Sequence, residues 1–319
     1  MDRNNSEKVV PITSADVRPS VDEAMARDGL SQTAVARESG LSTSAVSQYL
    51  AGNYKGNLAA VERKLAKWLV SRDRRSTMTS AAIPEAAFFE GPAALKIMAT
   101  LEYAQQAGDM ASIIGAPGVG KTRAANEYAG RNPNCWIATI TPSSSNVAMT
   151  LTEICDVIGV HPENFRGARS MAQIVRMRVR GTHGLLIVDE AQHLTLPAIE
   201  EIRSIHDATG VGIALLGSYA FQARVSHERL QARTAQIMSR LGMRVSIARP
   251  TDEDVEAMLD AWKISGAKER AFLKKLAAGA GALRNVAKTI RLAGLSAAAV
   301  KEPLQFKHLE DARAALDGE

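Results

Sequence analysis

The stretch from Gly115 to Thr122, GAPGVGKT, contains residue types that bind a nucleoside triphosphate. It matches the G-x-x-x-x-G-K-[ST] pattern at every fixed position. Glycines let such a loop wrap closely around phosphates, and the following helix adds the positive end of its dipole. Lys121 is expected to reach the β- and γ-phosphates, and the Thr122 hydroxyl to ligate Mg²⁺. The predicted nucleotide-binding residues are Gly115, Ala116, Pro117, Gly118, Val119, Gly120, Lys121, Thr122, Arg123 and Asp189.

A pair of acids follows a later apolar run. Residues 184–188 are continuously apolar and lead into Asp189 and Glu190, which predicts a buried parallel strand that ends in two carboxylates. Asp189 is predicted to hold the Mg²⁺ shell with Thr122, and Glu190 to polarise a water for attack on the γ-phosphate. This chemistry needs positioning and charge stabilisation, not a covalent nucleophile. The predicted activity is hydrolysis of ATP to ADP and phosphate, with ATP and Mg²⁺ as cofactors.

Alternating strand and helix patterns between residues 85 and 250 supply the frame for these side chains. Strands are predicted at 111–114, 135–140, 184–189, 211–216 and 243–247, and helices at 93–106, 123–129, 147–158, 169–180, 196–207 and 228–241. Short parallel strands with helical crossovers form a doubly wound α/β sheet with the nucleotide at its carboxyl ends. Residues 251–319 predict only helices, which begin with a capping box through Asp254 and form an all-α lid.

Residues 1–70 predict a small all-α domain with a helix-turn-helix unit. Its two helices, 31–39 and 42–50, flank a turn at Gly40, and a third helix covers 58–70. The second helix of such a unit enters the major groove of DNA. Its exposed polar residues are therefore candidate DNA contacts: Thr43, Ser44, Ser47 and Gln48. A helical bundle used for protein contacts is the alternative. Residues 71–84, rich in Arg, Ser, Thr and Ala, predict a basic flexible linker.

Composition limits the class of protein. The chain has 319 residues, enough for two or three compact units, and a formal net charge of +5 that favours polyanionic partners. Cys135 and Cys155 lack metal-ligand spacing and a disulfide framework, which predicts buried thiols in a reducing compartment. There is no signal-peptide pattern and no apolar run of membrane-spanning length. We therefore expect a cytoplasmic protein with no membrane partner.

An α/β P-loop core followed by a small helical lid resembles the AAA+ ATPases, over roughly residues 85–317. The resemblance implies a polar sensor-1 residue at Ser218. It also implies a sensor-2 arginine at Arg284, in the sequence GALR that opens a lid helix. Arg240, just before the last strand, occupies the region of the arginine finger that completes a neighbouring subunit's site, so the family predicts an oligomer. A solvated helix face is the alternative for Arg240.

Several segments make the resemblance more specific: ESGLST at 38–43, GAPGVGKT at 115–122, ITPS at 140–143, and GALR at 281–284 followed by IRLA at 290–293. With the helix-turn-helix domain, linker, core and lid, they resemble the family of the phage Mu transposition protein B over nearly the whole chain. The family implies an ATPase that binds double-stranded DNA largely without sequence specificity and forms helical filaments on it. It further implies delivery of that target DNA to a transposase, release on ATP hydrolysis, and action in the cytoplasm of a bacterial host.

A basic segment gives independent support for DNA binding. Five arginines and no acid lie between residues 166 and 180, and Arg169, Arg176 and Arg180 share one helical face suited to phosphates. A solvated or subunit-facing basic surface is the alternative for these arginines. Thr141 and Ser143, after the second strand, are weaker candidates for contacts with the DNA backbone. Two other functions fit the same motifs: a helix-turn-helix transcriptional regulator switched by ATP, and a replication-initiator or helicase-loader ATPase. Binding to one palindromic site would favour the first, and binding of a helicase the second.

Overall fold

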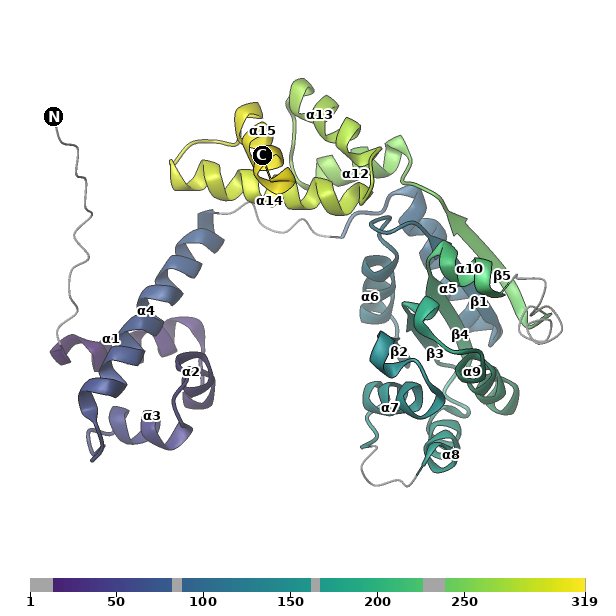
Figure 1. The fold of residues 1–319 in the computed structure, drawn as a ribbon, viewed down its shortest axis with the longest axis horizontal. Coiled ribbons are helices and arrows are strands. Elements are labelled where there is room, and N and C mark those ends of the chain that lie inside the picture. The colour runs from purple at the N-terminus through teal and green to yellow at the C-terminus, as the bar shows by residue number, and fades with distance from the viewer. Residues whose placement is uncertain (1–13, 82–87, 162–166, 226–238, 319) are drawn as a thin grey trace. The chain divides into compact units, whose positions relative to one another are not determined.

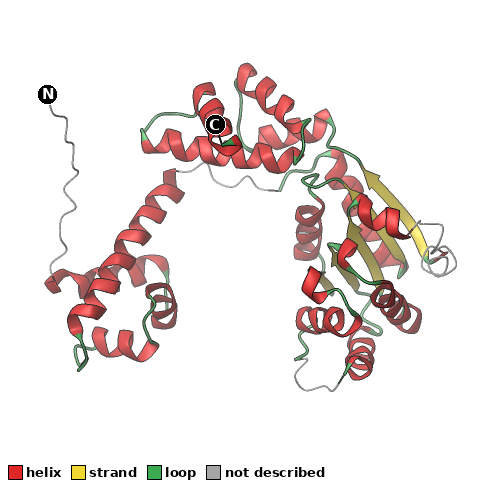
Figure 2. Cartoon of the chain, in the orientation of Figure 1, coloured by secondary structure: helices red, strands yellow, loops and turns green. Residues whose placement is uncertain are grey.

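The computed structural model describes residues 14–81, 88–161, 167–225 and 239–318. Its contacts divide the chain into two compact units, Met1–Ala82 and Ile83–Glu319. Figure 1 labels their helices and strands, and Figure 2 shows that the strands all belong to the second unit. Among the described residues, the first unit has one buried apolar cluster, and the second has one on each face of its sheet and a third in its last helices. No described helix is both long and apolar enough to cross a membrane.

The described part of the first unit is a bundle of four helices: α1 (Ser14–Asp28), α2 (Gln32–Ser39), α3 (Thr43–Leu50) and α4 (Leu58–Ala81). Val21, Val35, Val46 and Leu65, one from each helix, are fully buried in its core.

Local capping residues fix the tight turn between α2 and α3. The side chain of Ser31 accepts a hydrogen bond from the backbone N–H of Ala34 at the start of α2, and Ser42 does the same for Ala45 at the start of α3. Between them Gly40 ends α2 with φ +66°, a conformation that glycine adopts without strain. The two helices and their turn therefore lie where the sequence predicted them.

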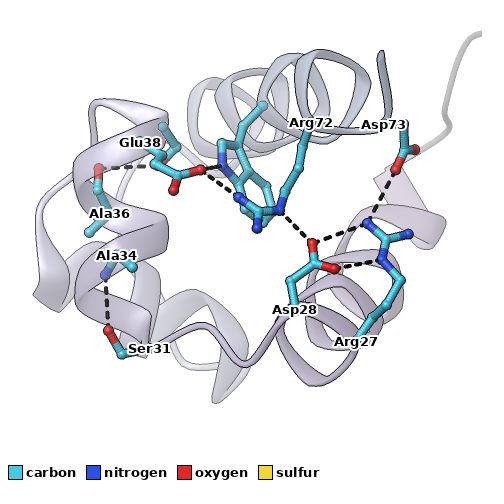
Figure 3. A network of polar contacts seen from close by, with 10 residues as sticks. Arg27, Asp28, Ser31, Ala34, Ala36, Glu38, Arg72 and Asp73 are labelled. Atoms are coloured by element: carbon cyan, nitrogen blue, oxygen red, sulfur yellow. Dashed lines mark hydrogen bonds and ion pairs between the residues drawn. The ribbon is translucent and has the colours of Figure 1, made fainter. Parts of the chain in front are cut away.

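Charged side chains hold α4 against the ends of α1 and α2 (Figure 3). Arg72 donates from Nε to Asp28 Oδ2 at 2.7 Å and from Nη1 to Glu38 Oε2 at 2.9 Å. The indole Nε1 of Trp68 also donates to Glu38 Oε2, at 2.9 Å. Hydrogen bonds from Arg27 first and Arg72 second lower the pKa of Asp28 to about 2. Two carboxylates on separate helices thus fix one arginine of α4.

The structure differs from two sequence predictions in this unit. The linker predicted over 71–84 is helical up to Ala81, because α4 continues through it, while residues 82–84 lie outside the described part. Apolar periodicity is lost there, but Arg72 stabilises the helix through ion pairs with other elements. Helix α1 was not predicted, and it contains Pro19. The domain limits 1–70, 85–250 and 251–319 remain predictions.

Five parallel strands of the described residues form the centre of the second unit: β1 (Met110–Gly115), β2 (Cys135–Thr139), β3 (Leu185–Asp189), β4 (Gly212–Gly217) and β5 (Leu241–Ile247), in the order β2-β3-β4-β1-β5. Successive side chains enter opposite layers. In β1, Met110 and Ile114 join one apolar cluster, and Ala111 and Ile113 join the other. Burial on both faces accounts for the almost wholly apolar strands β1, β3 and β4, whereas the edge strands β2 and β5 are partly exposed. The parallel sheet between two helical layers confirms the predicted doubly wound fold.

Helices cover both faces of this sheet. One face packs against α5 (Pro92–Ala107) and α6 (Lys121–Arg131), and the other against α7 (Val147–Val157), α8 (Ala168–Val179), α9 (Leu196–Thr209) and the short α10 (Tyr219–Val225). Short 3₁₀ turns, η1 (Pro142–Ser144) and η3 (Ala191–His193), follow β2 and β3. The helix predicted over 228–241 falls largely outside the described residues.

The lid consists of α12 (Asp252–Ala261), α13 (Ala267–Ala277), α14 (Ala282–Ala299) and α15 (Phe306–Asp317), around a separate apolar cluster. The carboxylate of Asp254, only 1% exposed, joins the lid to the sheet layer. Its Oδ2 accepts from the backbone N–H of Thr251 at 2.8 Å, and its Oδ1 accepts from that of Ala93 at 2.8 Å. One side chain thus caps the first turns of both α12 and α5.

Candidate active site

The phosphate loop connects the carboxyl end of β1 to the first turn of α6. Gly118 and Gly120 have φ angles of +86° and +94°, which only glycine adopts readily. The ammonium of Lys121 donates to the backbone carbonyls of Gly115 at 2.8 Å and Ala116 at 3.1 Å. The loop therefore curls around the lysine head group, next to the positive end of the α6 dipole.

Two oxygen-bearing side chains meet beside this loop, as the motifs predicted. Thr122 Oγ1 donates to Asp189 Oδ2 at 2.7 Å, and Asp189 Oδ1 accepts from the backbone N–H of Glu190 at 2.8 Å. Asp189 is 2% exposed at the end of β3. A buried carboxylate next to a hydroxyl is a donor set that fits Mg²⁺, which prefers hard oxygen ligands.

Burial and neighbouring charges act in opposite directions on Lys121. Burial is the largest influence and lowers the pKa of the lysine ammonium. The carboxylates of Asp189 and Glu190 raise that pKa, and the nearby cation Arg284 lowers it further. A partly desolvated ammonium held by neutral carbonyls interacts more strongly with an incoming phosphate than a fully hydrated one.

A cleft of about 520 Å³ opens between the phosphate loop and lid helix α14. The two sides touch at Gly118, where an added Cβ would lie 2.1 Å from the carbonyl oxygen of Gly281. Because α14 begins at Ala282, a second helix amino terminus lies at the loop. The lining residues are Phe89, Pro117, Gly118, Gly120, Lys121, Thr122, Arg123, Glu190, Gln192, Ser218, Met258, Leu283, Arg284, Ala287, Lys288 and Arg291.

The lid contributes three cations to this cleft. Only Arg284 was expected from the sequence, but Lys288 and Arg291 line the same cavity. They follow Arg284 at spacings of four and seven along α14, which places all three on one helix face. That spacing was a signal in the sequence that could have identified the other two. The guanidinium of Arg291 also lies 5.9 Å from the ring centroid of Trp262.

The predicted acid Glu190 and sensor Ser218 lie at the carboxyl ends of adjacent strands and are joined through Gln192. Glu190 has φ +56°, and its Oε2 accepts a hydrogen bond from Gln192 Nε2. Gln192 Oε1 accepts from the backbone N–H of Ser218 at 3.1 Å. All three residues line the cleft. The sequence analysis did not identify Gln192, because its contact with Ser218 depends on the order of the strands.

Arg240 lies at the opposite end of β5 from the cleft. Leu241, the next residue, pairs with Met110 at the amino end of β1, whereas Ile247 pairs with Gly115 at the phosphate loop. Arg240 Nε forms an ion pair with Asp207 Oδ1 at 3.0 Å, and its side chain is 52% exposed.

The candidate DNA contacts of the first unit and of the loop after β2 are all accessible. The exposed residues are Thr43, Ser44, Ser47, Gln48, Thr141 and Ser143. Thr141 also caps η1, where it forms a capping box with Ser144.

The arginines of α8 differ from one another in their surroundings. Arg169 is exposed. Arg176 Nη2 donates to Glu201 Oε1 at 2.8 Å and to Ser204 Oγ at 3.1 Å, both on α9. Arg180 Nη2 donates to the backbone carbonyl of Ala208 at 3.0 Å. The shared face predicted for the three arginines is therefore partly used within the fold.

Family models and solved structures were compared with the chain. An AAA domain model matches residues 104–225, and the model described as "Mu B transposition protein, C terminal" matches residues 239–316. The Aeropyrum pernix ORC1 protein, solved in complex with DNA, has a TM-score of 0.56 and 16% identity, covering 76% of this chain and 69% of that one. The Aeropyrum pernix ORC2 protein has a TM-score of 0.54 and 16% identity, with 70% and 66% covered. These likenesses concern the fold.

Sequence relatives extend over most of the chain. The "ATP-dependent target DNA activator B" of Escherichia phage Mu is 34% identical over 284 residues, which is 89% of each protein. The "Mu-like prophage FluMu DNA transposition protein B" of Haemophilus influenzae is 35% identical and covers 75% of this chain and 83% of its own length. The fold and the cleft thus define a P-loop ATPase of the AAA+ class. Within that class, the chain belongs to the family of Mu B transposition proteins.

Proposed function

We propose that this chain is an ATPase that binds target DNA as an oligomer when ATP is bound and delivers that DNA to a transposase. The observation that carries the proposal is the length of the similarity to the target DNA activator of phage Mu. Its 284 aligned residues are more than the unit Ile83–Glu319 contains, so the similarity reaches into the first unit. A shared ATPase core alone would not extend that far. We further propose that the protein acts in the cytoplasm of a bacterial host.

In the proposed reaction, Lys121 exchanges its loop carbonyls for the β- and γ-phosphates of ATP. Thr122 and Asp189 would hold Mg²⁺, which neutralises charge on the phosphate oxygens when bound. Glu190 orients and polarises the attacking water, and Arg284 brings the lid onto the γ-phosphate. Ser218, at the end of β4, completes the polar lining beside Glu190.

Oligomerisation follows from the proposed role of Arg240. Since Arg240 lies at the opposite end of β5 from the cleft of its own subunit, it can complete only a neighbour's site. Its ion pair with Asp207 must then be exchanged for contact with phosphate, which costs little because this pair is largely exposed to solvent. Hydrolysis would remove the γ-phosphate contacts of Lys121, Arg284 and the finger together. Loss of those contacts would release the neighbouring subunit and the DNA.

The proposed DNA contacts lie in two separate basic or polar regions, one in each unit. The exposed polar residues of α3 suit contacts with phosphates and base edges, and they remain our candidates in the first unit. In the second unit, Arg169 and Arg180 are exposed at the two ends of α8, and the loop residues Thr141 and Ser143 are further candidates.

The test is binding to random-sequence duplex DNA with ATP, ADP or no nucleotide, with negative-stain electron microscopy of the same samples. We expect filaments only with ATP, their loss in Lys121→Ala, and their persistence in Glu190→Gln, which should bind ATP but hydrolyse it only at a slow residual rate. Discrete particles on one preferred sequence, whatever the nucleotide, would overturn the proposal and favour a helix-turn-helix regulator. Recruitment of a helicase in place of a transposase would favour a loader.

A further inference from the structure

Gln192 connects two strands at the edge of the sheet where the cleft opens. Its side-chain Nε2 donates to Glu190 Oε2, just after β3, and its Oε1 accepts from the backbone N–H of Ser218, just after β4. A primary amide is suited to this bridge because it offers both a donor and an acceptor. The carboxylate of Glu190 is therefore linked to the end of the neighbouring strand by one side chain.

The surroundings of Gln192 fix its position from several sides. A Cβ added at Gly217 would lie at van der Waals distance, 3.4 Å, from Gln192 Oε1, so the amide lies close to the backbone of Gly217 at the end of β4. Arg224 Nη2, from α10, donates to the backbone carbonyl of Ala191 at 3.3 Å, and Ala191 is fully buried. The 3₁₀ turn that carries Gln192 is thus held by its backbone while its side chain reaches Ser218.

We propose that Gln192 is a positioning residue for ATP hydrolysis. It holds the carboxylate of Glu190 at a fixed place in the cleft and couples that place to the end of β4 through the backbone N–H of Ser218. In this arrangement β4 is linked to Glu190 through the backbone N–H of Ser218. The link does not depend on what the Ser218 hydroxyl contacts. The inference rests on the proposed role of Glu190 in orienting the attacking water.

The first test separates hydrolysis from nucleotide binding in the full-length protein with random-sequence duplex DNA. Gln192→Ala should lower kcat by about 10²-fold, the cost of a misplaced catalytic group, while the Kd for ATP stays within about twofold of the unchanged protein. Gln222→Ala is the matched control, since Gln222 is exposed on neighbouring α10. Unchanged kcat, or a loss of ATP affinity at unchanged kcat, would overturn the proposal.

Two variants of similar size test whether hydrogen bonding matters and whether the fold is intact. Gln192→Met keeps the volume without the amide, and Gln192→Glu keeps the shape but cannot donate to Glu190 when ionised. Both should match the kcat loss of Gln192→Ala, with the Tm of the apo protein unchanged. Normal kcat in Gln192→Met would assign the residue to packing alone and overturn the proposal.

A double-mutant cycle distinguishes failure of this inference from failure of the proposed function. If Gln192 acts through Glu190, Gln192→Ala should cause no further loss of hydrolysis in a Glu190→Gln background. A full additional loss there would contradict the inference while leaving the role of Glu190 intact. Wild-type hydrolysis by Glu190→Gln alone would remove the proposed role of that carboxylate, and the inference with it.

Discussion

The nucleotide cleft and helix α8 both concentrate cations, but their cations have different partners. In the cleft, the described contacts of the Lys121 ammonium are backbone carbonyls, and Arg284 and Lys288 line an open cavity. On α8, Arg176 is bound to the carboxylate of Glu201 and to the hydroxyl of Ser204. Similar residue types thus serve a ligand site in one region and hold two helices together in the other.

The difference shows which cations can be recruited by an anion. A carbonyl carries only a partial charge, so exchanging it for a phosphate gains electrostatic energy. A guanidinium already paired with a carboxylate must first lose that pair, which cancels much of the gain. Arg72 of the first unit, bound to Asp28 and Glu38, is of the second kind. Arginine-rich segments therefore indicate nucleic-acid binding only after their internal partners are known.

Lys121→Ala should have the largest effect. The lost ammonium makes charge-assisted hydrogen bonds worth about 1.5–3 kcal/mol each, so ATP affinity should fall by about 10²-fold or more. The Tm of the apo protein should change little, because the lysine contacts carbonyls that water can also satisfy. Fluorescent-nucleotide titration measures the effect, with Lys96→Ala on the exposed face of α5 as the control. Undiminished ATP affinity in Lys121→Ala would contradict the phosphate-loop assignment.

Gly118→Ala tests how closely the lid and the phosphate loop approach. The new Cβ would lie 2.1 Å from the carbonyl oxygen of Gly281, so we expect apo stability to fall by about 1–3 kcal/mol. Gly120→Ala is the control, because Gly120 shares the positive φ but has nothing within 4 Å of the new atom. Calorimetry of both variants separates the clash from backbone strain. Equal losses of stability in the two variants would show that the close approach to Gly281 does not contribute to the effect.

Arg176→Ala should act on stability and not on DNA. Its partners on α9 are partly exposed, so we expect a loss of about 1 kcal/mol in the free energy of unfolding. Glu201→Ala should cost a similar amount, and the double variant should lose less than the sum of the two. Denaturant unfolding measures these values. A large fall in DNA affinity with unchanged stability would show that Arg176, like the cations of the cleft, is available to bind an anion.

The pH dependence of the stability of the first unit tests a second set of ion-paired arginines, Arg27 and Arg72. The folded pKa of Asp28 is lowered from 3.8 to about 2 by Arg27 and Arg72. Stabilisation from this group should therefore be complete above about pH 4 and disappear as the pH falls towards about 2. Asp28→Asn should flatten that part of the curve of Tm against pH. Identical curves for the variant and the unchanged protein would show that the network adds no stability.

Arg169→Ala should have the smallest effect, confined to DNA binding. The exposed Arg169 has room for a phosphate, so its loss should reduce the slope of log K against log salt by about 1 and leave Tm unchanged. Salt titrations of binding to random-sequence duplex measure the slope. A lower Tm in this variant would instead place Arg169 among the structural arginines.

The parts of the molecule that the sequence predicted are those set by local patterns. The phosphate loop, the acids after β3 and the strands themselves depend on short runs of residues and were located correctly. The contact of Gln192 with Ser218 depends on strand order, and the pairing of Arg176 with Glu201 depends on how α8 packs on α9. Neither is encoded within a short segment.

The end of a helix was also predicted incorrectly from the sequence. The periodicity of α4 fades near Arg72, which pairs with Asp28 of α1 and Glu38 of α2, so the helix was ended too early. Tertiary ion pairs override local composition there, as they commonly do.

The order of strands in the sheet also determines when the protein can respond to ATP during its synthesis. Strand β1 lies between β4 and β5, and both leave the ribosome long after it. The described helices of the first unit lie within residues 14–81 and can pack as soon as they emerge. The cleft must wait for the lid, because α14 lines one side of it. A prematurely terminated chain would therefore contain the folded amino-terminal helices without a complete nucleotide cleft.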